Sequence, residues 1–426
     1  MSEAAMASRG PPRDPALTLT ALWTALGIAL VVLFPLLTPG LLLLALAAPA
    51  AWFYAETGRL PQPAPSAAII LLGSIALYLA VNASWSASRG DAYRSVLLFV
   101  AIVFILNLGL RTLPAIGEAP RRAMAAGLLI GLFVGALFVA VEIWEKQAIR
   151  RAVMSAFPAL RSDPRHMTTA GDAVTMLAPH LLNRHLTVLV LMFWPAAWIM
   201  SRSATRGRWL GAASLAATAA AVAGSVHATS KLALIGSAAV FGASHLAPSL
   251  TRRMVAVGFA LATILVVPLS LLAHDLCAAS WLPKSAQQRV VIWGATAAEV
   301  AKAPILGAGV ANARALKDVW GAPREPCAEY PVSLGIHSHN GYLQVWYDTG
   351  AVGALLLLAL GLVVLRALSQ CAAQLQPYLY ATFAACALMA ASSFSIWQPW
   401  FLSALAFSAL AAMLARVVPP PRSDAG

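Results

Sequence analysis

Residues 337–367 read HSHNGYLQVWYDTGAVGALLLLALGLVVLRA, so two histidines and a carboxylate stand directly before a long apolar run. The run from 350 to 367 is long enough to cross a bilayer as a helix. Ionisable side chains such as His337, His339 and Asp348 lose hydration at such a boundary, which makes them functional candidates. The stretch therefore predicts a membrane helix with a candidate site at its beginning.

The rest of the chain repeats this apolar pattern. Of its 426 residues, 60% are hydrophobic and only 11% are charged, whereas soluble domains carry about 25% charged residues. We predict an all-α, polytopic helical bundle that forms a single membrane domain over residues 1–426. The apolar runs indicate about twelve spans, at approximately 16–38, 40–54, 67–85, 94–110, 123–144, 184–201, 208–225, 231–248, 254–274, 350–367, 378–396 and 400–417.

The distribution of basic residues predicts the orientation. The formal charge of +13 could suggest a nucleic-acid partner, but Lys and Arg gather between the spans, so we expect no nucleic acid. Short segments on one side hold Arg9, Arg13, Arg59, Arg111, Arg121, Arg122, Arg202, Arg206, Arg208, Arg252, Arg253, Arg366, Arg416 and Arg422, and those on the other hold Arg89, Arg94 and Lys231. Because basic residues favour the cytoplasmic side, we expect both termini in the cytoplasm. Nothing at the N-terminus resembles a cleavable signal peptide.

Two long loops then fall on the outer side. The first, 145–183, opens with a basic helical segment, which suggests either a surface for anionic headgroups and substrate or an ordinary interfacial segment. The second, 275–349, is expected to hold short interfacial helices and the catalytic residues. Cys277 and Cys327 both lie in this second loop, so we predict a disulfide between them and two free thiols, Cys371 and Cys386.

Two cationic residues are candidates for binding an anion. Arg289 shares a helical face with Trp293, which could hold the guanidinium by a cation–π contact and present it to a diphosphate. Lys231 opens an apolar helix whose start Thr229 and Ser230 can cap. Either cation could instead extend toward lipid headgroups.

The histidines allow more than one interpretation. A neutral imidazole can act as a general base toward a hydroxyl group, but the pair could also be structural. Within a helix, His337 and His339 would point in nearly opposite directions, so only one is expected to serve a site. We expect no metal, because three suitable ligands are not gathered in the sequence. Gly307 and Gly309 could permit close approach to a phosphate, although such a pair more often makes a turn.

Taken in order, these features resemble the O-antigen ligase (WaaL) family of the O-antigen ligase and Wzy polymerase superfamily. The resemblance rests on Ser230-Lys231, on Arg289 to Trp293, on the glycine loop from Pro304 to Gly309, and on His339-Asn340 followed by Gly350 and Gly353. It implies a GT-C-like architecture of about twelve spans with a large periplasmic loop before span ten. Where the family often has Ser-Arg, this chain has Ser230-Lys231, which keeps the charge but loses the forked geometry of arginine.

The family transfers a polysaccharide from undecaprenyl diphosphate to the lipid A-core oligosaccharide, at the periplasmic face of the bacterial inner membrane and without a metal or other cofactor. By this resemblance His339 and Arg289 are the expected catalytic residues. Lys231, His337, Asn340 and Trp293 are expected to bind substrate. Asp348 and Glu329 are alternative acid–base or orienting groups.

Related activities remain open at this point. An O-antigen polymerase or a protein O-oligosaccharyltransferase would share the chemistry and differ in the acceptor. The chain ends soon after its last span, which disfavours the protein-glycosylating type, since those enzymes usually carry a further periplasmic domain. A polysaccharide or lipid transporter is a more distant alternative, because transporters place ionisable groups near the bilayer midplane, and here most polar groups lie on one side.

Overall fold

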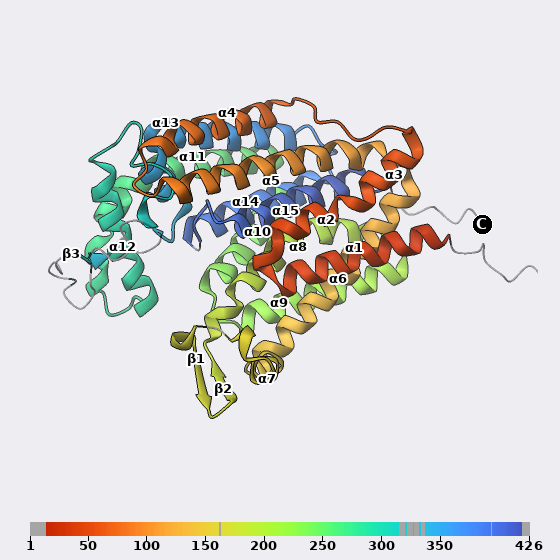
Figure 1. Ribbon diagram of the computed structural model, residues 1–426. Helices are drawn as coiled ribbons and strands as arrows, with labels where there is room; N and C mark the ends of the chain where they lie inside the picture. The colour runs from red at the N-terminus through yellow and green to blue at the C-terminus, as the bar shows by residue number, and fades with distance from the viewer. Residues whose placement is uncertain are drawn as a thin grey trace, which may run out of the picture.

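The computed structural model describes residues 14–161, 163–314, 320–321, 327, 332–333, 337–392 and 394–419. The chain forms a bundle of long helices that run side by side (Figure 1). The helices are α1 (Pro15–Leu33), α2 (Thr38–Ala45), α3 (Ala47–Thr57), α4 (Ala67–Asn82), α5 (Arg89–Ala115), α6 (Glu118–Trp144), α7 (Ala148–Ala156), α8 (Asn183–Ser201), α9 (Thr205–Gly224), α10 (Ala228–Leu246), α11 (Pro248–Leu272), α12 (Lys284–Val300), α13 (Gly341–Leu368), α14 (Gln376–Ser392) and α15 (Pro399–Val417).

The predicted all-α, polytopic membrane fold is confirmed. Within the described residues, nine segments are long and apolar enough to cross a bilayer: α1, the segment from Pro35 to Thr57, α4 with its extension to Trp85, α5, α6, the segment from Pro179 to Ser201, α11, α13 and α15. The other three predicted spans coincide with α9, α10 and α14, which pack within the bundle but are shorter or less apolar. The total of twelve spans stays a prediction.

Close helix packing depends on small residues. Gly127, Gly131 and Gly135 recur every four residues on α6, and a Cβ atom at each would collide with α1. Helix pairs in membranes approach closely through such stripes of small residues. The pair α1 and α6 thus anchors one side of the bundle, while α10 and α14 pack closely on another.

Both long loops lie at one end of the bundle, which we call the α12 end (Figure 1). The first loop holds α7 and an antiparallel hairpin of β1 (Met167–Ala170) and β2 (Ala173–Leu177), in which Met167 pairs with Leu177. The sequence analysis did not anticipate this hairpin. The second loop holds α12 and a short pairing of β3 (Trp320–Gly321) with β4 (Val332–Ser333). Helix α12 confirms the helical periodicity expected around Arg289.

Helix α13 is broken near its beginning. Gly350 has φ 61° and ψ −160°, a conformation open almost only to glycine. The break frees carbonyl groups that the loop from Pro304 to Val310 satisfies: the amides of Ala308 and Gly309 donate to the carbonyl oxygens of Tyr347 (2.8 Å) and Asp348 (3.0 Å). Asn82 supports the same junction, since its Nδ2 donates to the Asp348 carbonyl at 3.0 Å. The glycine loop is therefore a turn that braces α13, and the phosphate interpretation of Gly309 is wrong because its amide is already used.

Candidate functional site

The C-terminal end of α14 joins two of the predicted site segments. The Thr229 hydroxyl, beside Lys231 at the start of α10, donates to the carbonyl of Ser392 at 3.2 Å. The Tyr342 hydroxyl, at the start of α13, donates to the carbonyl of Ala387 at 3.2 Å. The beginnings of α10 and α13 therefore both contact the last turns of α14, although more than a hundred residues separate them in the chain.

The two histidines lie side by side just before α13. Their ring centroids are 4.1 Å apart, and the amide of His339 donates to Nδ1 of His337 at 3.1 Å. His339 has a positive φ of 55°, so the segment turns instead of continuing as a helix. The expectation that the two rings diverge is wrong, because it assumed helical geometry, and the two imidazoles lie together.

Asn340 begins α13 as its N-cap. Its Oδ1 accepts hydrogen bonds from the amides of Tyr342 (3.1 Å) and Leu343 (3.2 Å), and Ser338 bonds to the Asn340 backbone. Such a cap fixes where a helix starts and in which direction. The carbonyl oxygen of the Asn340 side chain is therefore committed to positioning the histidines, and a role in binding substrate stays a prediction.

Arg289 lies on α12 and faces the start of α10. Its positive charge, together with a larger effect of burial, lowers the pKa of His227 to about 4. His227 in turn contacts Ser230, with 2.7 Å between Nδ1 and Oγ. Burial also lowers the pKa of Arg289 itself, and its guanidinium forms no hydrogen bond or ion pair with any residue that the structure describes. A half-buried cation with no partner among the described residues is a candidate for binding an anionic ligand.

Trp293 does not hold Arg289 in place as predicted. In the described part of the chain, the cation–π contacts are those of Arg184 with Trp400 and of Arg202 with Trp198. Trp293 instead packs between two hydrophobic clusters, one of which contains the predicted disulfide. Its indole nitrogen is buried without a hydrogen-bond partner among the described residues, and its role in binding substrate stays a prediction.

The predicted disulfide fixes α12. Cys277 and Cys327 are bonded, with their Cα atoms 5.7 Å apart, and Cys371 and Cys386 are free, so both parts of the cysteine prediction are confirmed. The disulfide packs against Val290 and Val291, the two residues that follow Arg289. It therefore holds the part of α12 that carries Arg289.

The histidine segment also approaches α12. Ser338, between the two histidines, lines the same small gap as Thr296. Thr296 follows Arg289 by seven residues, which places it on the same helical face about 10 Å further along the axis. The histidine pair thus lies near α12 about two helical turns from Arg289, and both positions are at the α12 end.

Lys231 belongs to the same region through its neighbours. It is half-buried and follows Ser230 in the first turn of α10, and its Nζ forms no ion pair with the described residues. The predicted cap is wrong in detail: the N-cap of α10 is His227, and Ser230 bonds to the imidazole.

Glu329, an alternative acid–base residue, lies outside the described residues.

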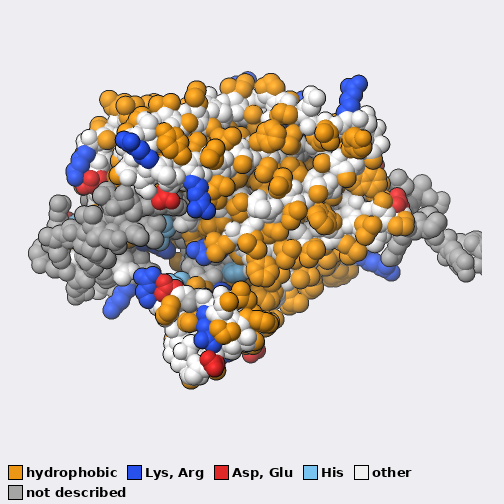
Figure 2. Space-filling model, in the orientation of Figure 1, with side chains coloured by type: hydrophobic (Ala, Val, Ile, Leu, Met, Phe, Trp, Pro, Cys, Tyr) orange, Lys and Arg blue, Asp and Glu red, His pale blue; other side chains and the backbone are white. Residues whose placement is uncertain are grey.

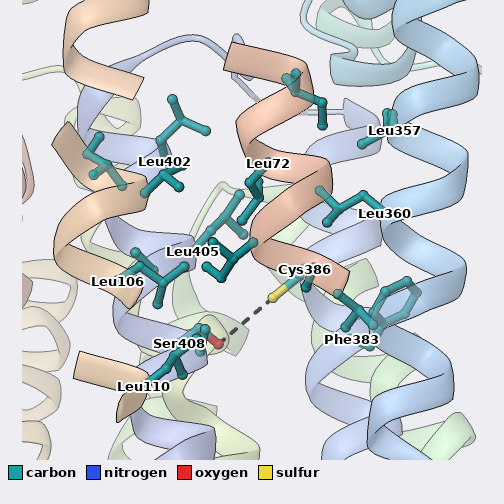
Figure 3. Close-up of a pocket in the computed structure, with 18 of the residues that line it drawn as sticks. Leu72, Leu106, Leu110, Leu357, Leu360, Phe383, Cys386, Leu402, Leu405 and Ser408 are labelled. Carbon is teal, nitrogen blue, oxygen red and sulfur yellow. Dashed lines mark hydrogen bonds between the residues drawn. The ribbon is translucent and has the colours of Figure 1, made fainter. Parts of the chain in front are cut away.

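An apolar cavity of about 490 Å³ lies between α4, α5, α13, α14 and α15. Arg289, Lys231, His337 and His339 are not among the residues that line it. Figure 3 shows leucines of α4, α5, α13 and α15 pointing into it, and the hydrogen bond between Cys386 and Ser408 in its lining. Ile396 lines one end and lies against Gly341, beside the histidine segment. Thr349 and Leu368 of α13 both line the cavity. They are nineteen positions apart, so the cavity extends roughly 28 Å along the helix, which is close to the thickness of a hydrocarbon core.

Comparison with known proteins addresses this region directly. Residues 188–358, about two fifths of the chain, match the model of the family described as O-antigen ligase. This matched segment, called the O-antigen ligase segment below, is similar to that family. Two proteins named "Putative polysaccharide ligase" match over 120 residues, one from Rickettsia conorii at 30% identity and one from Rickettsia felis at 28% identity. Each match covers 28% of this chain, and it spans 29% and 30% of the respective relative.

The O-antigen ligase segment contains the region described above. Lys231, Arg289, His337 and His339 all fall within residues 188–358, so the family resemblance drawn from the sequence is confirmed for the part of the chain that carries it. His227 also lies in the segment, although the sequence analysis did not select it. Its position one helical turn before Lys231 could have identified His227 as a candidate site residue from the sequence.

Proposed function

We propose that this chain is an O-antigen ligase, a glycosyltransferase that moves a polysaccharide from undecaprenyl diphosphate to the lipid A-core oligosaccharide. One observation carries the proposal: Arg289 and Lys231, which form no ion pair with the described residues, lie with two imidazoles at the α12 end. The histidine segment borders Ile396, which lines the apolar cavity. Such a site suits a donor with a diphosphate head and a long apolar tail. The O-antigen ligase segment supports the choice of reaction.

In this proposal Arg289 and Lys231 bind the donor diphosphate. A guanidinium can donate two parallel hydrogen bonds to phosphate oxygens, and a lysine at a helix start adds a second positive charge. Negative charge grows on the diphosphate as the glycosyl bond breaks, so both cations stabilise the transition state more than the ground state. They supply the charge that a metal would supply elsewhere, and no metal is required.

His339 receives the acceptor. Its imidazole accepts a hydrogen bond from the attacking hydroxyl of the core sugar and takes the proton as the oxygen bonds to the anomeric carbon. The bond between that carbon and the diphosphate oxygen breaks on the opposite face, and undecaprenyl diphosphate leaves with the electron pair. Direct displacement of this kind inverts the anomeric centre. His337, held against His339, orients the ring.

The undecaprenyl tail occupies the apolar cavity. The cavity end at Ile396 lies beside the histidine segment, so a lipid with its tail inside would present its head to Arg289 and His339. The basic residues on short segments favour a cytoplasmic location for the opposite end of the bundle. The α12 end accordingly faces the periplasm of the bacterial inner membrane, where a disulfide is stable.

Lipopolysaccharide from a deletion strain tests this function against polymerisation of O-antigen. Loss of a ligase leaves uncapped core, with full-length polymer still on the lipid carrier. Loss of a polymerase leaves cores capped by single repeats. The proposal predicts uncapped core in the deletion strain, and capped lipopolysaccharide again when the wild-type chain is restored. Cores capped by single repeats would overturn the proposal in favour of a polymerase.

A further inference from the structure

Two arginines outside the O-antigen ligase segment form a second cationic cluster at the α12 end. Arg184 stands in the first turn of α8, and its guanidinium carbon lies 5.8 Å from the centroid of the Trp400 ring. It forms no hydrogen bond or ion pair with the residues described, and its Nε is buried without a partner. Arg150 of α7 lies within electrostatic reach, because Arg184 and burial both lower the pKa of Arg150.

The nearby carboxylate does not neutralise this cluster. Glu142 is fully buried, and its two oxygens accept hydrogen bonds from the amides of Ile149 (2.9 Å) and Arg150 (3.3 Å). Its charge is thus used to cap the start of α7. The Arg150 guanidinium donates from Nη1 to Oε1 of Gln147 at 2.8 Å. Two guanidinium groups against one carboxylate leave a positive charge in excess.

Aromatic rings separate this cluster from the proposed donor site. Trp400 contacts Phe394, with ring centroids 4.6 Å apart, and Phe394 contacts His227, with centroids 6.1 Å apart. His227 lies within electrostatic reach of Arg289. The two cationic positions therefore lie along the same end of the molecule without sharing a side chain. Figure 2 shows basic side chains and histidines around the hollow between the bundle and the lower part of the molecule, where α7, β1 and β2 lie.

The surface of α7 indicates where a ligand would come from. Ile149, Val153 and Phe157 recur every four residues and are exposed, while Met154 on another face is buried against β2. An apolar stripe that points away from the protein is typical of a helix lying in a membrane interface. An anion that reaches Arg150 and Arg184 would therefore arrive as the headgroup of a lipid.

We propose that Arg184 and Arg150 bind a phosphate group carried by the acceptor lipid, at a site distinct from the donor diphosphate site. The inference rests on the proposed function for the identity of the acceptor. Guanidinium groups bind phosphate through forked hydrogen bonds. Because Arg289 and Lys231 are assigned to the donor, the cluster beyond Trp400 serves the other substrate and holds it with its sugar chain toward His339.

The test is a binding measurement, so it does not depend on turnover. Full-length protein in nanodiscs is titrated with phosphorylated lipid A-core and with the same lipid after phosphatase treatment. We expect wild type to prefer the phosphorylated lipid about tenfold or more, and Arg184→Gln and Arg150→Gln to remove that preference. Arg184→Lys should restore part of it. Arg165→Gln is the matched control, because Arg165 lies exposed in the first long loop, which also holds Arg150, and pairs with Asp163.

Several outcomes would overturn the inference. It fails if wild type binds both lipids equally, if Arg184→Gln keeps the full preference, or if inorganic phosphate at millimolar concentration displaces the lipid from wild type. It also fails if Arg184→Gln weakens binding of undecaprenyl diphosphate as strongly as Arg289→Ala does, since the cluster would then belong to the donor. Failure of the proposed function would appear differently, as absence of glycan transfer by wild type.

Discussion

At the scale of single residues, the account depends most on the shape of the Arg289 side chain. Arg289→Lys keeps the charge and loses the fork that matches two phosphate oxygens, so we expect transfer to fall at least tenfold, with Arg289→Ala lower still. Initial rates with purified protein measure the effect. Lys284→Ala is the matched control, because Lys284 is an exposed cation at the start of the same helix. Equal rates for Arg289→Lys and wild type would remove the diphosphate assignment.

His227 predicts how stability depends on pH. Its pKa is lowered to about 4 from about 6.5 in an unfolded chain, so the unfolded state binds its proton first as the pH falls. The contribution of His227 to stability is complete above pH 6.5 and declines toward pH 4, by at most about 3 kcal/mol. As the pH is lowered from 6.5 to 4, the melting temperature in detergent should therefore fall less for His227→Gln than for wild type. Identical slopes would contradict the buried, neutral imidazole.

Residue types alone predicted part of this site. Histidines, Arg289 and Lys231 stood out because ionisable groups are rare in so apolar a chain. The mutual positions of these residues were not predictable, because the turn at His339 and the contacts of α14 depend on tertiary packing. The same reason explains why a cation–π contact was assigned to Trp293 when the structure gives such a contact to Arg184 and Trp400.

At the scale of elements, the disulfide governs the position of α12. Replacement of Cys277 and Cys327 by alanine removes a link between residues 50 positions apart, which is worth up to about 4 kcal/mol to the structure it closes. We expect a large loss of transfer while the membrane helices stay folded, measured by activity beside circular dichroism. Mild reductant should inactivate wild type and leave the remaining activity of the double variant unchanged. Full activity of the double variant would show that α12 needs no such link.

The break in α13 makes a second prediction at this scale. Gly350→Ala introduces a side chain where φ is positive and where a Cβ atom would collide with the carbonyl of Ile305. We expect strong destabilisation of the junction with the glycine loop, seen as a lower melting temperature and a loss of transfer. Gly258→Ala is the control, since a Cβ atom there meets nothing within 4 Å. A Gly350→Ala variant as stable as the control would contradict the helix break.

Elements with strong periodicity or long apolar runs were predictable from the sequence. Helix α12 agrees with the helical periodicity expected around Arg289, because that pattern is local. Helix α13 begins at Gly341, before the apolar run that starts at 350, because Asn340 caps it there. The hairpin β1–β2 was missed, since its strands are short and mostly exposed. The bracing of α13 by residues 304–310 was also missed, because it requires Asn82 from a distant helix.

At the scale of the whole molecule, the space in the cavity should determine how well the protein uses donor lipids of different tail length. Ala409 lines it on α15, so Ala409→Phe would fill part of the space for an undecaprenyl chain. We expect weaker use of the full-length donor, seen as a higher KM, and little change with a short-chain prenyl diphosphate donor. Ala279→Phe, outside the cavity, is the control. Equal effects on both donors would place the tail elsewhere.

The central claim is that the cations and histidines at the α12 end catalyse glycan transfer between two lipids. The most direct measurement is a reaction of purified protein with lipid-linked O-antigen, lipid A-core and a metal chelator, followed by gel analysis of the products. The account predicts capped lipopolysaccharide with wild type, and none with His339→Ala or Arg289→Ala present at equal amounts in the membrane. Normal capping by either variant, or dependence of wild type on a metal, would contradict it.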